Sequence, residues 1–126
     1  GQGAVDDVDD EDAWGIPSNP NVFSGLLLKL KSDPNIKLEL ISSLLGQRRM
    51  HKVRYLNGGR EENMHESMLT ICEPKKNDRI VVVKGGECGD RGKIINLEDE
   101  DYIVQVDGAG DSVSIYEGKY IGKLAS

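Results

Sequence analysis

Short stretches in which apolar and polar residues alternate dominate the chain from residue 79 onwards. Residues 79–84 (RIVVVK) form a β-branched run, and three later stretches alternate or nearly alternate, namely residues 93–97, 102–106 and 113–116. Short strands about ten residues apart, separated by charged or glycine-rich turns, are typical of a small β-barrel. We therefore expect residues 74–126 to form an all-β domain.

The first half of the chain has a weaker pattern of the same kind. Residues 22–31 end in alternation and predict a strand, whereas residues 36–45 fit either a strand or one face of a helix. Residues 50–56 (MHKVRYL) alternate and lead into Asn57-Gly58, for which we expect a type I′ hairpin turn.

A polar return strand is expected to follow this hairpin as an exposed edge. It covers residues 60–66, after which Met68, Leu69 and Ile71 are expected to bring the chain back to the core. Together these stretches predict a divergent β-barrel over residues 22–73.

The chain before this region differs in composition. Residues 6–12 hold six acidic residues and no basic one, which leaves too little apolar content to fold. We expect residues 1–21 to be a disordered acidic tail and linker. Trp14 in this linker either anchors a partner or packs on the first domain. We favour packing, because a lone indole beside prolines commonly packs on its own protein.

The formal net charge of -6 comes from this acidic run, because the remaining acids and bases are equal in number. Residues 22–76 carry ten bases and six acids, and residues 77–126 carry six bases and ten acids. The asymmetry indicates different partners for the two halves, and chance is the alternative. No apolar run approaches the roughly 18 residues of a membrane span, so we expect a soluble protein.

Four glycines lie between the first two strands of the second half, at Gly85, Gly86, Gly89 and Gly92. A tight loop between barrel strands requires positive φ and close chain approach, which glycine accommodates without strain. A phosphate-binding loop would instead open a helix, whereas a strand pattern (KIINL) follows Gly92. We therefore expect this loop to be structural.

Residues 78–94, with DRIVVVKGG followed by Gly89 and Gly92, resemble the KOW motif of NusG-type and ribosomal proteins. The surrounding residues 74–126 are similar to the final KOW domain of the large subunit of the elongation factor DSIF, the eukaryotic relative of NusG. This second similarity rests on residues 74–80, 92–97, 103–107 and 121–124. Over residues 22–73 only position and strand pattern support a KOW domain.

The resemblance implies two SH3-like KOW barrels in tandem within a nuclear transcription elongation factor. It implies contacts with RNA polymerase II, other elongation factors, RNA or DNA, and no enzymatic activity, cofactor, membrane or small-molecule substrate. The loop carries Glu87 and Cys88 where the family commonly has basic residues. Protein contact is therefore the expected role of the second half.

Nucleic acid, if bound, is expected at the first half, where basic residues cluster around one hairpin with a tyrosine as a stacking platform. The candidate residues are Arg48, Arg49, His51, Lys52, Arg54, Tyr55 and Arg60. Ordinary solvated charges are the alternative.

Two other functions remain as alternatives. A tandem KOW module of an RNA-processing protein, of the G-patch and KOW-motif or KIN type, would have the same arrangement. A small redox or metal enzyme is the remote alternative, because His51, His65, Cys72 and Cys88 lack the spacing of a zinc site. Two cysteines indicate a reducing compartment, with a single disulfide as the alternative.

Overall fold

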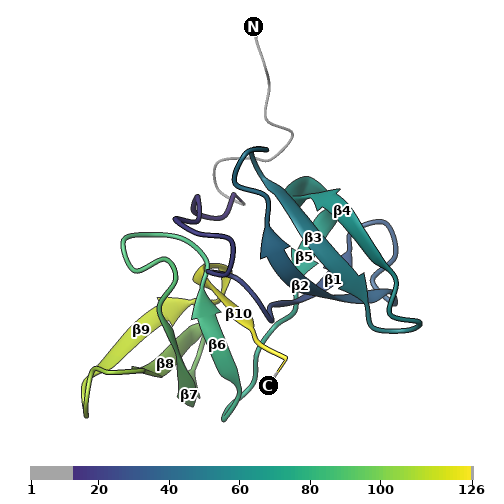
Figure 1. Ribbon diagram of the computed structural model, residues 1–126. Coiled ribbons are helices and arrows are strands. Elements are labelled where there is room, and N and C mark those ends of the chain that lie inside the picture. Colours follow the sequence, from purple (N-terminus) through teal and green to yellow (C-terminus); the bar gives the residue numbers. More distant parts are fainter. Residues whose placement is uncertain (1–12, 126) are drawn as a thin grey trace, which may run out of the picture.

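The computed structural model describes residues 13–125, and over this range the protein is all-β, as predicted. Its strands form two five-stranded antiparallel sheets that lie side by side (Figure 1). Disorder was predicted for residues 1–21, of which residues 1–12 lie outside the described residues. The start of the described part instead packs on the protein, since Ala13 and Trp14 are buried. No helix within the described range has the length and apolarity needed to cross a membrane.

The first sheet has the strand order β4-β3-β2-β1-β5, so that the fifth strand lies beside the first. Its strands are β1 (Leu27–Leu30), β2 (Lys37–Ser43), β3 (Met50–Tyr55), β4 (Glu61–His65) and β5 (Leu69–Ile71). A single turn of 3-10 helix, η1 (Glu66–Met68), precedes the last of them.

The second sheet repeats this arrangement with the order β10-β6-β7-β8-β9. Its strands are β6 (Arg79–Val82), β7 (Arg91–Glu98), β8 (Asp101–Val106), β9 (Val113–Glu117) and β10 (Ile121–Lys123). The 3-10 turn η2 (Gly118–Tyr120) occupies the place that η1 has in the first sheet. The domain boundary between residues 73 and 74 stays a prediction, and it falls in the connection between β5 and β6.

The ambiguous residues 36–45 form a strand, β2, and the helical alternative is wrong. Leu38 and Leu40 are fully buried, as expected for a strand with one face on the core. The register against β3 then shifts between Leu40 and Ser42, so that Ser43 is the next buried residue. This β-bulge puts the alternation out of phase, which explains why the sequence pattern was ambiguous.

The predicted hairpin after β3 is present, but its turn is different. Positive φ occurs at Gly58 (98°) and Gly59 (79°) and not at Asn57. The backbone N–H of Tyr55 donates to the carbonyl of Arg60, which closes a four-residue loop. The type I′ turn expected at Asn57-Gly58 is therefore wrong, because the two glycines take the left-handed conformations.

Two further expectations for the first half need correction. The strand predicted over residues 22–31 is limited to Leu27–Leu30, since turns occupy residues 20–25. Met68 does not join the core: it lies in η1 and is 48% exposed, whereas Leu69 is buried. The chain thus returns to the core one residue later than expected.

The strand β6 and Val83, the residue that follows it, supply side chains to two apolar cores. Ile80 and Val82 pack in the core of the second sheet, while Val81 and Val83 pack in the core of the first. All four are essentially inaccessible to solvent. Full burial of a valine contributes about 1.5–3 kcal/mol, so this alternation holds the two sheets together.

Contacts near the C-terminus strengthen the junction. Leu26 and Leu124 form an isolated antiparallel bridge, and both belong to the first core. A Cβ added at Gly122 would overlap the side chain of Leu26 and lie 2.7 Å from Ile71 Cγ2. Gly122 is therefore where β10 approaches the first sheet too closely for any side chain.

Candidate interaction surface

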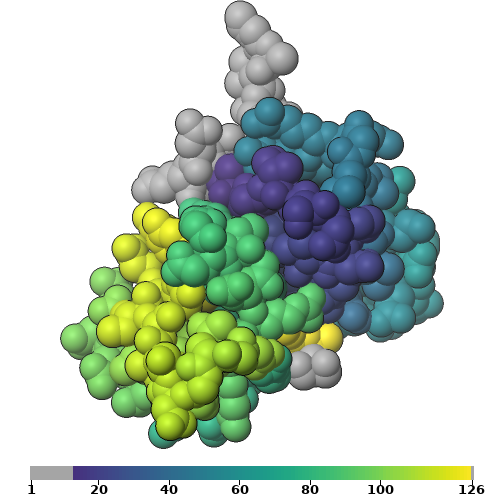
Figure 2. Space-filling model, turned by 60° about the vertical axis from the view of Figure 1, so that its left-hand side comes forward, coloured from purple at the N-terminus to yellow at the C-terminus, as the bar shows by residue number. Residues whose placement is uncertain are grey.

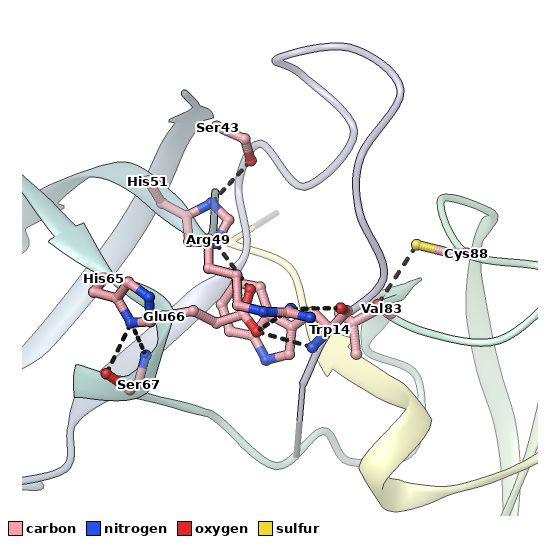
Figure 3. Close-up of polar contacts among 9 residues, drawn as sticks. All are labelled: Trp14, Ser43, Arg49, His51, His65, Glu66, Ser67, Val83 and Cys88. Carbon is pink, nitrogen blue, oxygen red and sulfur yellow. Dashed lines mark hydrogen bonds and ion pairs between the residues drawn. The ribbon is translucent and has the colours of Figure 1, made fainter. Parts of the chain in front are cut away.

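A buried polar network centred on Glu66 fastens the linker to the first sheet (Figure 3). The carboxylate oxygen Oε2 accepts hydrogen bonds from the backbone N–H of Trp14 at 2.9 Å and from Arg49 Nη1 at 3.2 Å. Arg49 also donates to the Trp14 carbonyl at 3.1 Å. The Arg49 and Glu66 side chains are only 7% and 3% exposed, so each depends on the other to be tolerated in the interior.

His51 extends the network on the other side of Glu66. Its Nε2 lies 3.2 Å from Glu66 Oε1, and its Nδ1 lies 2.9 Å from Ser43 Oγ. The Trp14 indole stacks on the imidazole, with ring centroids 4.9 Å apart. Although serine, histidine and glutamate recur in hydrolytic sites, here all three are at least 96% buried and packed against a tryptophan. We assign this network a structural role.

The linker also contacts the second sheet. The backbone N–H of Gly15 donates to the Val83 carbonyl at 2.6 Å, and a Cβ at Gly15 would lie 2.7 Å from Cys88 Sγ. Figure 2 shows these N-terminal residues, in purple, packed between the first sheet and the green β6–β7 region. Trp14 itself is 6% exposed, which favours packing over an exposed anchor.

The cysteines and histidines do not form a reactive centre in the described part of the chain. Both Cys72 and Cys88 are free thiols. Burial, with a smaller contribution from Asp90, raises the pKa of the Cys88 thiol and so disfavours the thiolate. Within residues 13–125 no three histidine, cysteine, aspartate or glutamate side chains lie close enough to hold a metal ion.

Two of the seven candidate nucleic-acid-binding residues lie inside the protein. The strand alternation of β3 turns His51 to the core, and Arg49, with φ of 60°, directs its guanidinium at Glu66. Neither side chain is available to a phosphate, so both have to be removed from the candidate surface. The sequence pattern already separated His51 from Lys52 and Arg54, but it did not indicate which face is buried.

The remaining candidates are partly paired with acids. Arg54 lies 2.6 Å from Glu39, and Arg60 lies 3.4 Å from Glu62. Arg60 also covers the ring of Tyr55, with its guanidinium carbon 4.6 Å from the centroid. These contacts reduce the positive potential and occupy the ring expected to stack on a base. Arg48 is exposed but lies in the β2–β3 connection, at the opposite end of β3 from Arg60, and Lys52 on β3 is half-buried.

The glycines of the β6–β7 loop differ in what they contribute. Gly85 and Gly89 have φ of 90° and 101°, which a residue with a side chain rarely adopts. Gly92 has no positive φ, but a Cβ there would overlap the carbonyl oxygen of Gln105 on β8. Gly86 has neither property, contrary to expectation, because its φ is not positive and the space around it is open.

Arg91, which the sequence did not single out, links this loop to the first half. Its guanidinium Nη2 donates to the Val22 carbonyl at 3.2 Å and to the Ser24 carbonyl at 2.8 Å. These carbonyls belong to the turns before β1, which need donors that no neighbouring strand supplies. Its position after Gly89-Asp90, where the loop meets β7, gives no sign of this contact in the sequence.

The sequence also gave no indication of the exposed surface around β9, the edge strand of the second sheet. Val113 and Ile115 on this strand are 48% and 64% exposed. A hollow of about 550 Å³ lies beside it and is lined from β9, η2 and the glycine loop. The strand was predicted, but alternation alone could not show that its apolar residues face solvent.

Comparison with known proteins finds a family model similar to the region of the second sheet. Residues 72–124 match the family model described as the seventh KOW domain of the transcription elongation factor SPT5. The matched range covers β6 to β10 and the glycine loop. No curated protein matches the chain.

Proposed function

We propose, on the premise that residues 72–124 belong to the seventh KOW domain family of the transcription elongation factor SPT5, that this chain is a non-enzymatic binding module of such a factor. In this proposal it acts in the nucleus and contacts RNA polymerase II and associated elongation factors. The family similarity supports a role in transcription elongation. The surfaces described above support contacts with other proteins.

The observation that carries the proposal is the use of β6 in both cores. Together with the Trp14 network and Arg91, it fixes the two sheets as one body whose outer edges remain available. Such a body is suited to holding two partners at a fixed spacing. The shared strand order of the two sheets supports the proposal that residues 22–73 are a divergent KOW barrel and residues 74–126 a second one.

The charge distribution favours protein as the main ligand of the second half. Residues 77–126 carry ten acids and six bases, and Glu87 lies in the glycine loop. A phosphate backbone would be repelled by this surface. Binding of RNA or DNA through the first half is a weaker proposal, since Arg49 and His51 are internal and Arg54 and Arg60 are paired.

The proposal is tested by affinity purification from nuclear extract with the full chain as bait, with and without nuclease. We expect RNA polymerase II subunits and elongation factors to be recovered in both conditions, because protein contacts survive nuclease. Recovery of spliceosomal proteins in their place would instead support the RNA-processing alternative. A Trp14→Ala bait, which weakens the junction between the sheets, serves as the matched variant and should recover less polymerase.

A further inference from the structure

One long edge of the second sheet is formed by β9. This strand pairs with β8 on one side only, and no strand of residues 13–125 covers its other side. In Figure 1, β9 lies on the side of the second sheet that faces away from the first. Its backbone therefore offers hydrogen-bonding groups to an added strand.

The outer face beside this edge is apolar. Ile115 lies directly opposite Ile103 on β8, and Val113 is opposite Gln105 on the same face. Natural edge strands are commonly protected by charged residues, proline or a bulge. The strand β9 has no proline or bulge, and its one charged residue is Glu117 at its end, so residues 113–116 have none of these. An exposed apolar edge without such protection indicates a site that a partner covers.

The hollow beside β9 adds chemical selectivity. Ile115 and Tyr116 point to opposite faces of the sheet, yet both line the hollow, so it lies at the edge itself. The other lining residues are Lys84, Gly85, Gly86, Glu87, Asp101, Glu117 and Tyr120. Three carboxylates and two aromatic rings line the hollow against one lysine, Lys84, whose Nζ lies 5.4 Å from the Tyr120 ring centroid. The excess of carboxylates suits one further lysine or arginine side chain.

We propose that the β9 edge binds an extended segment of a partner protein, in which apolar residues alternate with lysine or arginine. The segment pairs with β9 as an added antiparallel or parallel strand. Its apolar side chains lie on Val113 and Ile115, and one basic side chain enters the hollow. This inference rests on the proposed function, because it assigns the partner class of the same binding module.

The charge of the β9 edge favours a basic protein segment over a second copy of this chain or a nucleic acid. The row Glu98, Asp101 and Glu117 lies in register across three strands, so like charges are directly opposite one another. Lys119 Nζ lies 3.8 Å from Glu117 Oε2 and offsets that end of the row, which leaves the opposed Glu98 and Asp101 as the part that costs stability. A second copy of this chain would bring another such row to the edge, and a nucleic acid would bring phosphates. A basic segment brings no like charge to this edge, and its basic side chains can reach the carboxylates that line the hollow.

The test uses the full chain and two synthetic nine-residue peptides, in which valine alternates with arginine or with glutamate. In an NMR titration to millimolar peptide, we expect the arginine peptide to shift the amide signals of residues 113–117 and of Gly86. The glutamate peptide should leave them unchanged. An arginine peptide N-methylated at alternate residues, which cannot pair as a strand, should bind at least tenfold more weakly.

Two variants make the result specific. Ile115→Asp and Glu117→Lys should each weaken the arginine peptide at least tenfold, while Leu45→Asp, at a similarly exposed apolar residue of the first half, should not. Because Ile115 is 64% exposed, its replacement leaves the core intact. Equal binding of the glutamate or N-methylated peptide, or shifts confined to residues outside β9, would overturn the inference.

The affinity purification separates this inference from the proposed function. If the Ile115→Asp bait recovers as much elongation machinery as the unaltered chain, the β9 edge is not the contact, although the module remains an elongation module. If the unaltered chain recovers no elongation machinery, the proposed function itself fails, whatever the peptide result.

Discussion

The Trp14 indole stacks on the His51 imidazole, 37 positions along the chain, at an interplanar angle of 29°. Trp14 also meets Phe23 edge-on at 5.7 Å, and its backbone is held by Glu66 and Arg49. A residue of the linker is thereby part of the core of the first sheet.

Trp14→Ala should lower the free energy of unfolding by about 3–5 kcal/mol, because it removes a buried aromatic ring and leaves a cavity. The measurement is urea unfolding followed by circular dichroism, since the variant lacks the only tryptophan. Ile16→Ala, at a 64% exposed neighbour, is the control and should change the value by less than about 0.5 kcal/mol. Equal effects of the two changes would contradict the packing of Trp14.

Glu66→Gln should destabilise the fold by about 3–5 kcal/mol, because Arg49 then remains buried without a counter-charge. Arg49→Met combined with Glu66→Gln should recover part of this loss, as no isolated charge is left. Glu62→Gln, in an exposed pair with Arg60, is the matched control and should cost less than about 1 kcal/mol. If the loss of unfolding free energy in the double variant equals the sum of the losses in the two single variants, the two side chains are not coupled.

Gly122→Ala should cost about 1–3 kcal/mol or more, since the added methyl group overlaps Leu26 at the junction of the sheets. Gly46→Ala is the control, because nothing lies within 4 Å of its Cβ position and its φ is not positive. Thermal unfolding of both variants gives the comparison. Similar melting temperatures would mean that β10 does not pack closely on the first sheet.

The Arg79–Asp107 pair should make stability depend on pH in acid. Its bidentate hydrogen bond lowers the pKa of Asp107. The carboxylate therefore stabilises the fold above its unfolded pKa of about 3.9, and this contribution is lost as pH falls through the lower folded-state pKa. Both side chains are more than a third exposed, so we expect less than about 1 kcal/mol.

Urea unfolding of the unaltered chain and of Arg79→Met at pH 7, 5, 3 and 2 tests this dependence. The difference between them should be constant at pH 7 and 5 and should shrink at pH 3 and 2. Asp107→Asn should remove the same pH-dependent part, and adding Arg79→Met to it should remove no more. A difference that does not change with pH would rule out the assignment.

Arg48→Glu with Lys52→Glu should weaken any RNA or DNA binding by the first half and flatten its salt dependence. Each lost phosphate contact should reduce the log–log salt slope by about 0.7–0.9. Fluorescence anisotropy with a labelled single strand at 20–200 mM salt, about the range over which screening changes most, measures this. If the unaltered chain has no affinity at the lowest salt, the first half does not bind nucleic acid.

The second sheet was predictable because its signals are local. A β-branched run, glycines with positive φ at Gly85 and Gly89, and the close approach at Gly92 are all dictated by backbone geometry within a few residues. The strands of the first sheet were harder to predict from the sequence, since the bulge after Leu40 interrupts the alternation of apolar and polar residues in β2. The all-β class followed from the pattern in both cases.

The surfaces were less predictable because they depend on distant residues. Whether His51 or Lys52 faces solvent is decided by Trp14 and Glu66, which lie outside β3. Arg91 likewise contacts turns almost 70 positions earlier in the chain. Residue type and spacing identify a cluster of charges, but they do not show which charges the fold itself uses.

The dual role of β6 also limits how the two halves can change independently. A fragment comprising residues 74–126 alone would expose the apolar side chains of Val81 and Val83 to solvent. A fragment ending at residue 73 would lack these two side chains from its core. We therefore expect a single melting transition. A substitution at Val81 or Val83 is therefore expected to destabilise the two halves together.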